Sequence, residues 1–191
     1  MPQAASCNPI NLMEPLPDTI LPQDLARLAV ESYIAQGARI APPGLPQGVL
    51  AEQAGAFVTI RTSEGRLRGC IGTTQPTCGS VAEEVIQNAI SAATRDPRFL
   101  PVDKPELPLL TYGVDVLSPP IAARGLEDLD PLFFGVIVET FDGKRRGLLL
   151  PQISGIETAQ AQWDAVHEKA GISPGTPVLV HRFTVRRFGK E

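Results

Sequence analysis

Residues 55–73, GAFVTIRTSEGRLRGCIGT, decide the fold of this chain. The first part, Gly55 to Thr62, is rich in β-branched residues and alternates in polarity, which is typical of a strand. Ser63-Glu64-Gly65 has the composition of a turn, and Arg66 to Gly72 then predicts a second strand that runs back along the first. We therefore expect an antiparallel hairpin in this part of the chain.

Helices and further strands are predicted on both sides of this hairpin. Pro22 suits the first turn of a helix and Gly37 suits its end, whereas Ser80 and Glu83 form a capping box. The predicted helices cover Pro22 to Gly37, Val81 to Thr94 and Thr158 to Ala170. The predicted strands cover Leu109 to Leu117, Phe134 to Phe141, Arg146 to Leu150 and Val178 to Val185, the last one leading to a basic tail with Arg182, Arg186, Arg187 and Lys190. Because hairpins dominate and helices do not alternate regularly with strands, we predict an α+β fold of mostly antiparallel sheets with flanking helices.

The composition is that of a globular protein and disfavours several classes. The chain has 191 residues, of which 43% are hydrophobic and 20% charged, and this fits neither a disordered nor a collagenous protein. No apolar run approaches the roughly 20 residues that cross a bilayer. A net charge of −4 disfavours binding to the phosphates of nucleic acids. Residues 1–17 contain four prolines and no apolar periodicity, so we predict a flexible leader before a single domain over 18–191.

Cysteine and histidine are scarce, and their spacing matches no common metal site. They stand at Cys7, Cys70, Cys78, His167 and His181. We predict no metal site and no disulfide framework from this set, and we interpret both histidines as structural. The phosphate-binding glycine loops, the nucleophile elbow of serine hydrolases and the zinc-protease motif are absent from the sequence, so we name no cofactor. Without a secretory signal in the sequence, we expect a cytoplasmic protein.

The residues that carry chemistry lie in the second strand of the hairpin. In an extended chain the side chains alternate, with Arg66, Arg68 and Cys70 on one face and Leu67, Gly69 and Ile71 on the other. Positive charge beside a thiol favours the thiolate, which is the reactive form. Gly69 and Gly72 allow close approach to the main chain. The hydroxyl of Thr73 and the start of the following helix add donors, so the segment predicts a site for a carboxylate or phosphate.

Two interpretations of this site stay open on the residues alone. Cys70 is either a nucleophile or redox centre activated by arginine, or a buried structural thiol between glycines that permit tight packing. Arg98, in the segment Asp96-Pro97-Arg98-Phe99, either reaches the same anionic ligand or pins a turn together with Asp96. Lys144-Arg145-Arg146 is interpreted in the same two ways, as solvated surface or as a binding site for a partner or ligand.

Leu67 to Thr73, LRGCIGT, resembles the signature of the AMMECR family, which is named after an Alport-syndrome chromosomal region. Further blocks resemble that family in the same order: Gly55 to Thr59, Asn88 to Ile90, Asp96 to Phe99, Glu106 to Pro108, Val116 to Pro120, Gly147 to Gln152 and Lys169 to Ile172. The resemblance covers about residues 20–188. It implies one α+β unit with two unequal lobes, the larger of which is assembled from both ends of the chain.

The resemblance also implies partners, although it implies no reaction. Bacterial members are called protein A of the AmmeMemoRadiSam system, so it implies a partnership with a Memo-type protein and a radical S-adenosylmethionine enzyme. We therefore expect an enzyme component with a Cys/Arg anion-binding site. Its residues are Cys70 as the catalytic group and Arg66, Arg68, Gly69, Gly72, Thr73 and Arg98 as ligand-binding groups. The alternative is a non-catalytic binding or adaptor module that presents the Arg68–Thr73 face to an anionic ligand or a partner protein.

Overall fold

Two compact units make up the chain in the computed structural model, which describes residues 16–173 and 175–189. The first unit extends to Val114 and takes in the end of the chain from Phe188, and the second unit is Asp115–Arg187. Most of the predicted leader, including Cys7, lies outside the described residues. None of the helices that the structure describes has the length and apolar character needed to cross a membrane.

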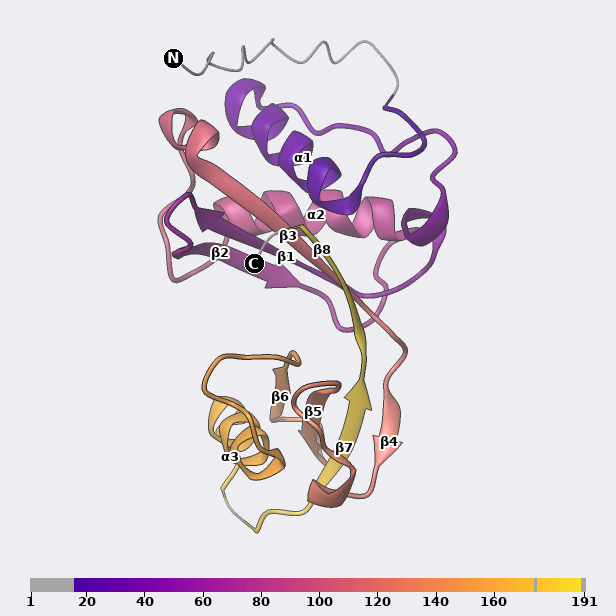
Figure 1. Ribbon diagram of the computed structural model, residues 1–191, viewed down its shortest axis with the longest axis vertical. Helices are drawn as coiled ribbons and strands as arrows, with labels where there is room; N and C mark the ends of the chain where they lie inside the picture. The colour runs from indigo at the N-terminus through magenta and orange to yellow at the C-terminus, as the bar shows by residue number, and fades with distance from the viewer. Residues whose placement is uncertain (1–15, 174, 190–191) are drawn as a thin grey trace. The chain divides into compact units, whose positions relative to one another are not determined.

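Each unit is built around one four-stranded sheet (Figure 1). The strand order is β2-β1-β3-β8 in the first sheet and β4-β7-β5-β6 in the second. The first sheet and its helices are α1 (Pro22–Gln36), β1 (Ala56–Thr62), β2 (Leu67–Gly72), α2 (Val81–Thr94), β3 (Leu110–Leu117) and β8 (Val185–Gly189), with the short helices η1 (Gly48–Ala51) and η2 (Lys104–Leu109). The second sheet and its helices are β4 (Ile121–Ala123), η3 (Leu126–Asp128), β5 (Gly135–Thr140), β6 (Arg146–Leu149), α3 (Ala159–Ala170) and β7 (Val178–Phe183). The predicted α+β class with antiparallel sheets and flanking helices is confirmed, as are the three predicted helices.

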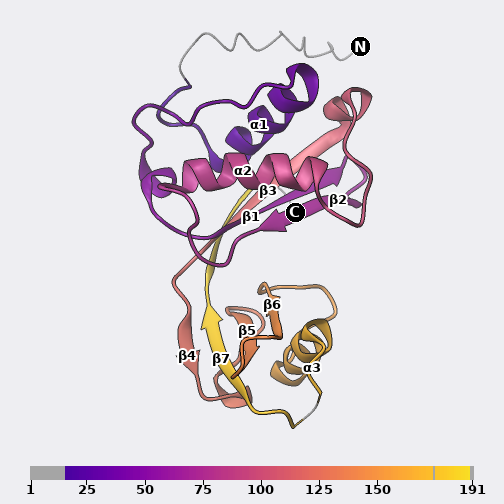
Figure 2. The ribbon, with the colours of Figure 1, turned by 180° about the vertical axis from the view of Figure 1, so that it is seen from behind.

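The first unit has two layers, with α1 and α2 on the same side of the sheet (Figures 1 and 2). Along β1 the side chains of Val58 and Ile60 are fully buried, whereas Thr59 and Arg61 between them are partly exposed. This alternation is the one that places apolar side chains on the helix-covered face of a strand. The predicted hairpin is confirmed, because β1 and β2 pair antiparallel with Thr59 opposite Cys70.

Helix α2 packs closely against the hairpin at Gly69. Gly69 pairs with Ile60 on the helix-covered face, and a Cβ atom added there would lie 2.2 Å from the carbonyl oxygen of Ala92 in α2. No side chain fits in that space. The expectation that Gly69 allows close approach to the main chain is confirmed, and the closeness of α2 to this strand depends on it.

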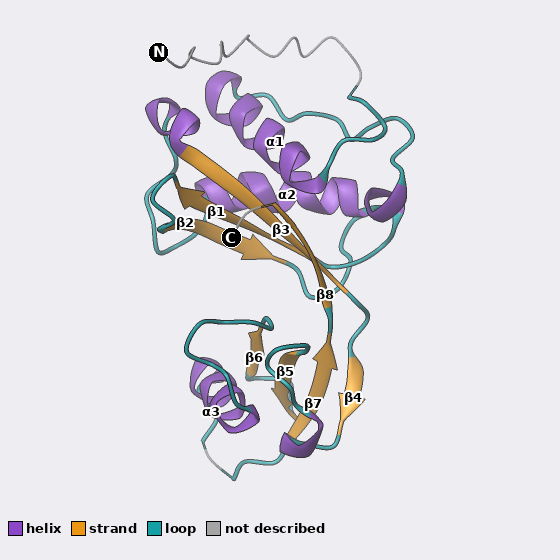
Figure 3. Ribbon diagram, in the orientation of Figure 1, coloured by secondary structure: helices purple, strands orange, loops and turns teal. Residues whose placement is uncertain are grey.

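The second unit packs α3 against one face of its sheet (Figure 3). Val136 and Val138 of β5, Val180 of β7 and Val166 of α3 belong to one buried apolar cluster. Strands β5 and β6 form an antiparallel hairpin, with Val136 opposite Leu149 and Glu139 opposite Arg146.

Two sequence expectations about strands are wrong. The residues predicted as a basic tail are divided: Arg182 lies in β7, Arg186 and Arg187 lie in β8 at the edge of the first sheet beside β3, and Lys190 lies outside the described residues. Charged side chains are common on edge strands because they oppose pairing with other chains, so their density misled the sequence interpretation. Strand β4 was not expected, since its three residues are too few to show a periodicity.

Replacing Gly69 with alanine tests the packing of α2 on the hairpin. We expect Gly69→Ala to lower the free energy of unfolding by about 2–3 kcal/mol, because a backbone carbonyl cannot yield to the new methyl group. Urea denaturation measures the change. The matched control is Gly44→Ala, since a Cβ atom at Gly44 meets nothing within 4 Å. Equal stability of the two variants would contradict the packing described for α2.

Candidate functional site

The motif strand β2 lies at an edge of the first sheet, and a side-chain pair closes that edge at Cys70. The N–H of Cys70 donates to Oδ2 of Asp96 over 2.8 Å, and Nη2 of Arg98 lies 3.4 Å from the carbonyl oxygen of Cys70. A neighbouring strand would offer Cys70 the same two groups, an acceptor for its N–H and a donor for its carbonyl oxygen. Asp96 and Arg98 thus satisfy the outward backbone groups of Cys70 and block strand addition at this point.

Asp96 and Arg98 are themselves joined by a bidentate ion pair. Nε and Nη2 of Arg98 lie 2.9 Å and 2.7 Å from the two carboxylate oxygens of Asp96. The Asp96 side chain is 2% exposed, whereas that of Arg98 is 53% exposed. The Arg98 guanidinium holds the pKa of Asp96 well below its ordinary value, although burial acts in the opposite direction. Arg98 therefore pins the turn, and its remaining nitrogen, Nη1, has no hydrogen-bond partner among the described residues.

Hydrogen bonds from Arg68 join strand β2 to the segment between α2 and β3. Its Nε and Nη2 donate to the carboxylate of Glu106 over 2.6 Å and 2.8 Å, and its Nη1 donates to the carbonyl oxygen of Leu100 over 2.9 Å. The Arg68 guanidinium lowers the pKa of Glu106, with burial opposing it. The ring of Phe99 is close to both guanidinium groups, with centroid distances of 5.9 Å to Arg68 and 5.5 Å to Arg98. Each of the two arginines thus has a carboxylate partner.

The thiol of Cys70 lies on the face of the hairpin that the helices leave uncovered. Its Sγ is 3.4 Å from Oγ1 of Thr59, the residue opposite it on β1, and both side chains are partly exposed. The predicted alternation holds for Gly69 and Cys70, but the register shifts between Ile60 and Arg61, so that Leu67 lies opposite Arg61 and Arg68 falls at the irregularity. Arg66 lies outside the strand, with its side chain 79% exposed beside Glu64 at the turn of the hairpin. The arginine that contacts Cys70 is Arg98.

The Thr73 hydroxyl, which was expected to bind an anion, instead donates to a carboxylate of the protein. Glu84 of α2 is fully buried and accepts hydrogen bonds from the hydroxyls of Thr73 and Thr77 and from the N–H groups of Thr77 and Cys78, over 2.6–2.9 Å. Burial raises the pKa of Glu84, but these hydrogen bonds outweigh it and the pKa lies below its ordinary value. The proton of the Thr73 hydroxyl is therefore directed to Glu84. Sequence reasoning missed this carboxylate, and only its closeness to several hydroxyl-bearing residues could have indicated it.

Gly72 is required by packing within the hairpin. A Cβ atom there would lie 2.2 Å from the side chain of Phe57, which faces it on β1. Both histidines belong to the second unit, where His167 Nδ1 is 2.8 Å from the carbonyl oxygen of Trp163 and its ring packs on that indole. Across residues 16–173 and 175–189 no three acidic, cysteine or histidine side chains are grouped as a metal site.

The chain as a whole is similar to known proteins. The AMMECR1 family model matches residues 23–191, and the chain belongs to this family. It is 46% identical to a protein of Thermotoga maritima over 161 residues, which are 83% of this chain and 91% of that protein. It is 40% identical to protein CA_C1420 of Clostridium acetobutylicum over 85% of this chain but only 34% of that longer protein. The crystal structure of the uncharacterized protein PH0010 from Pyrococcus horikoshii matches with a TM-score of 0.80 at 34% identity, covering 89% of this chain and 90% of that one.

Replacing Asp96 with asparagine tests the edge closure through its pH dependence. The pKa of Asp96 is lower in the folded state than the ordinary value of about 3.9, so its stabilisation is complete above that value and is lost as the pH falls below it. We expect Asp96→Asn to lower the free energy of unfolding by about 2 kcal/mol at pH 7, with a smaller difference from the wild type at pH 2. Urea denaturation between pH 2 and pH 7 measures this.

The control for Asp96 is Asp24→Asn, because Asp24 is 45% exposed and 4.0 Å from Arg27. We expect that control to change stability by less than about 1 kcal/mol at either pH. A gap between Asp96→Asn and the wild type that is the same at pH 2 and pH 7 would show that the charge of Asp96 is not what stabilises the edge.

Glu84→Gln tests the buried carboxylate. The new amide nitrogen has to face N–H or O–H donors, so we expect a loss of about 2–4 kcal/mol in the free energy of unfolding. The neighbouring Glu83→Gln serves as the control, since Glu83 is partly exposed and its side chain accepts one N–H, from Gly79. Thermal and urea denaturation of both variants give the comparison. If the two variants lose the same amount, the four hydrogen bonds to Glu84 do not carry the stability assigned to them.

Proposed function

We propose that this AMMECR1-family chain is the ligand-binding component of a multi-protein enzyme system, and that it holds an acidic group between Arg98 and Cys70. The observation that carries the proposal is the state of Arg98. Its guanidinium is fixed by Asp96 on one side, yet the side chain is 53% exposed and Nη1 lacks a partner among the described residues. A fixed guanidinium with free N–H groups is a preorganised donor for a carboxylate or a phosphate.

The carboxylates beside the arginines determine how such a ligand is held. Because Asp96 and Glu106 each neutralise one arginine, the cluster has little net charge to attract an anion from a distance. Recognition then depends on directed hydrogen bonds from Arg98 and on contact with the ring of Phe99 and the exposed side chain of Leu100. We therefore expect a modest affinity that depends only weakly on salt.

A binding role fits the surroundings of Cys70 better than independent catalysis does. Both histidines of the chain belong to the second unit, so the first unit holds no imidazole to act as a general base for the thiol. The carboxylates of Asp96 and Glu106 accept hydrogen bonds from arginines and have low pKa values, which makes them weak bases. In this proposal the chemical step belongs to a partner, and the chain presents the ligand.

The proposed partners are a Memo-type protein and a radical S-adenosylmethionine enzyme. Membership of the AMMECR1 family supports this partnership, and the longer relative from Clostridium acetobutylicum shows that the domain also occurs as part of a larger chain. We further propose a cytoplasmic location, because Cys70 and Cys78 are free thiols and a reducing compartment keeps them so.

A second candidate function, catalysis by Cys70, is favoured by one contact. The Sγ atom lies 3.4 Å from the hydroxyl of Thr59 and is partly exposed, so an electrophile bound at Arg98 could reach it. The exchange of sulfur for oxygen separates the two candidates. Cys70→Ser retains binding if the chain is a binding component, but it abolishes turnover if the thiol is the nucleophile.

A nuclear magnetic resonance titration with succinate and inorganic phosphate as probes tests the binding role. We expect saturable shifts of the Cys70 amide and the Arg98 side chain in the wild type, and loss of saturation, with affinity reduced by about tenfold or more, in Arg98→Ala. Cys70→Ser should bind within about twofold of the wild type. The control is Arg39→Ala, which removes an exposed arginine elsewhere in the first unit. Equal binding by Arg98→Ala and Arg39→Ala would overturn the assignment of Arg98.

A further inference from the structure

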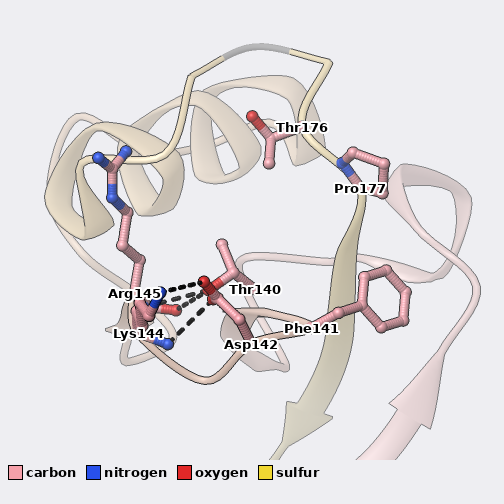
Figure 4. A pocket seen from close by; sticks show the side chains of 7 residues that line it. All are labelled: Thr140, Phe141, Asp142, Lys144, Arg145, Thr176 and Pro177. Atoms are coloured by element: carbon pink, nitrogen blue, oxygen red, sulfur yellow. Dashed lines mark hydrogen bonds and ion pairs between the residues drawn. The ribbon is translucent and has the colours of Figure 1, made fainter.

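A groove in the second unit lies at the tip of the β5–β6 hairpin, and none of the residues that line it belongs to the Cys70 site (Figure 4). It is open to solvent and has a volume of about 490 Å³. One wall is the hairpin turn and the other is the segment that leads into β7. The residues that line the groove are Thr140, Phe141, Asp142, Lys144, Arg145, Thr176 and Pro177.

Hydrogen bonds hold the hairpin wall of the groove in one shape. The hydroxyl of Thr140 donates to Asp142 over 2.7 Å and accepts the N–H of Arg145 over 3.1 Å. The carboxylate of Asp142 also accepts the N–H of Lys144. Nη1 of Arg145 donates to the carbonyl oxygen of Gly171, at the end of α3, and so ties the hairpin to the segment opposite. A ligand would therefore meet a wall that is already ordered, which reduces the entropy cost of binding.

The surface of the groove combines apolar and basic groups. Phe141 is 70% exposed at a turn where a polar residue is usual, and Pro177 adds a second exposed apolar ring. Lys144 is 81% exposed, and the one ion pair that it forms within the described part of the chain, with Asp142, is 3.5 Å long. The turn carries the basic residues 144–146 against two acids, because Lys144 pairs with Asp142 and Arg146 with Glu139, each over 3.5 Å, which leaves one excess positive charge in a chain whose net charge is −4. An excess of positive charge therefore lies beside an exposed aromatic side chain at this tip.

We propose that this groove docks an acidic segment of a partner protein that also carries an apolar side chain. Carboxylates of the segment would pair with Lys144 and with the free nitrogens of Arg145, while the apolar side chain would cover Phe141 and Pro177. A phosphate ion alone would leave the exposed ring uncovered, and the acidic charge of the chain opposes a nucleic acid. The charge complementarity of the groove favours an acidic peptide. This docking surface is independent of the ligand proposed for Arg98.

Fluorescence anisotropy with a fluorescein-labelled ten-residue peptide of alternating glutamate and leucine or phenylalanine tests the proposal. We expect saturable binding that weakens as salt is raised, and no saturable binding of the same peptide with lysine in place of glutamate. Lys144→Glu and Phe141→Ala should each weaken binding by about tenfold. Neither substitution should unfold the protein, because both side chains are largely exposed.

Matched controls separate the groove from general charge and general hydrophobicity. Arg39→Glu is the control for Lys144→Glu, because it reverses the charge of an exposed basic residue in the first unit. Leu45→Ala is the control for Phe141→Ala, because it removes an apolar side chain that is 73% exposed. Both should bind the acidic peptide within about twofold of the wild type, as should Arg98→Ala, so that failure here is distinct from failure of the Arg98 site. Equal weakening by Lys144→Glu and Arg39→Glu, or equal binding of the acidic and basic peptides, would overturn the proposal.

Discussion

The hydrogen bond from the N–H of Cys70 to Asp96 is the interaction on which the rest of the site depends. Strand β2 is at the edge of its sheet, and an edge strand has backbone groups that need a partner. Asp96 supplies that partner and at the same time orients Arg98 through two further hydrogen bonds. Arg98 is then fixed beside Phe99, whose ring also lies close to Arg68. One carboxylate thus joins the strand, the turn after α2 and the arginine cluster.

Most of the LRGCIGT motif serves the fold rather than a ligand. The absence of a side chain at Gly69 and at Gly72 leaves room for helix α2 and for the ring of Phe57, respectively. Arg68 donates hydrogen bonds to Glu106, and Thr73 donates one to the buried Glu84. These contacts account for the chemistry that makes the segment unusual in sequence. The groups of the site that remain available are the thiol of Cys70 and the outer edge of Arg98. The proposed ligand site is for this reason smaller than the motif, and it includes a residue from outside it.

The parts of the fold that depend on local sequence could be predicted, and those that depend on distant partners could not. The hairpin and the helix over Val81–Thr94 follow from alternation, turn residues and capping, which are properties of neighbouring residues. The pairing of Arg68 with Glu106 joins positions 38 apart, and no spacing rule indicates it. Glu84 was missed because a glutamate in the first turn of a helix is usually solvated, whereas here the preceding loop folds over it. Within the site, the alternation of Gly69 and Cys70 was predicted correctly, but simple alternation cannot show the register shift at Arg68, and the arginine that contacts Cys70 is Arg98 from outside the strand.

Hydrogen exchange at the amide of Cys70 tests the central claim most directly. The Cys70 N–H points away from β1, so the sheet does not protect it and any slow exchange depends on Asp96. In the wild type at neutral pH we predict exchange slowed by about a hundredfold or more relative to an unstructured chain, and most of that protection should vanish in Asp96→Asn while the amide of Ile71, inside the ladder, stays protected. Exchange of the Cys70 amide at the rate of an unstructured chain in the wild type would contradict the account.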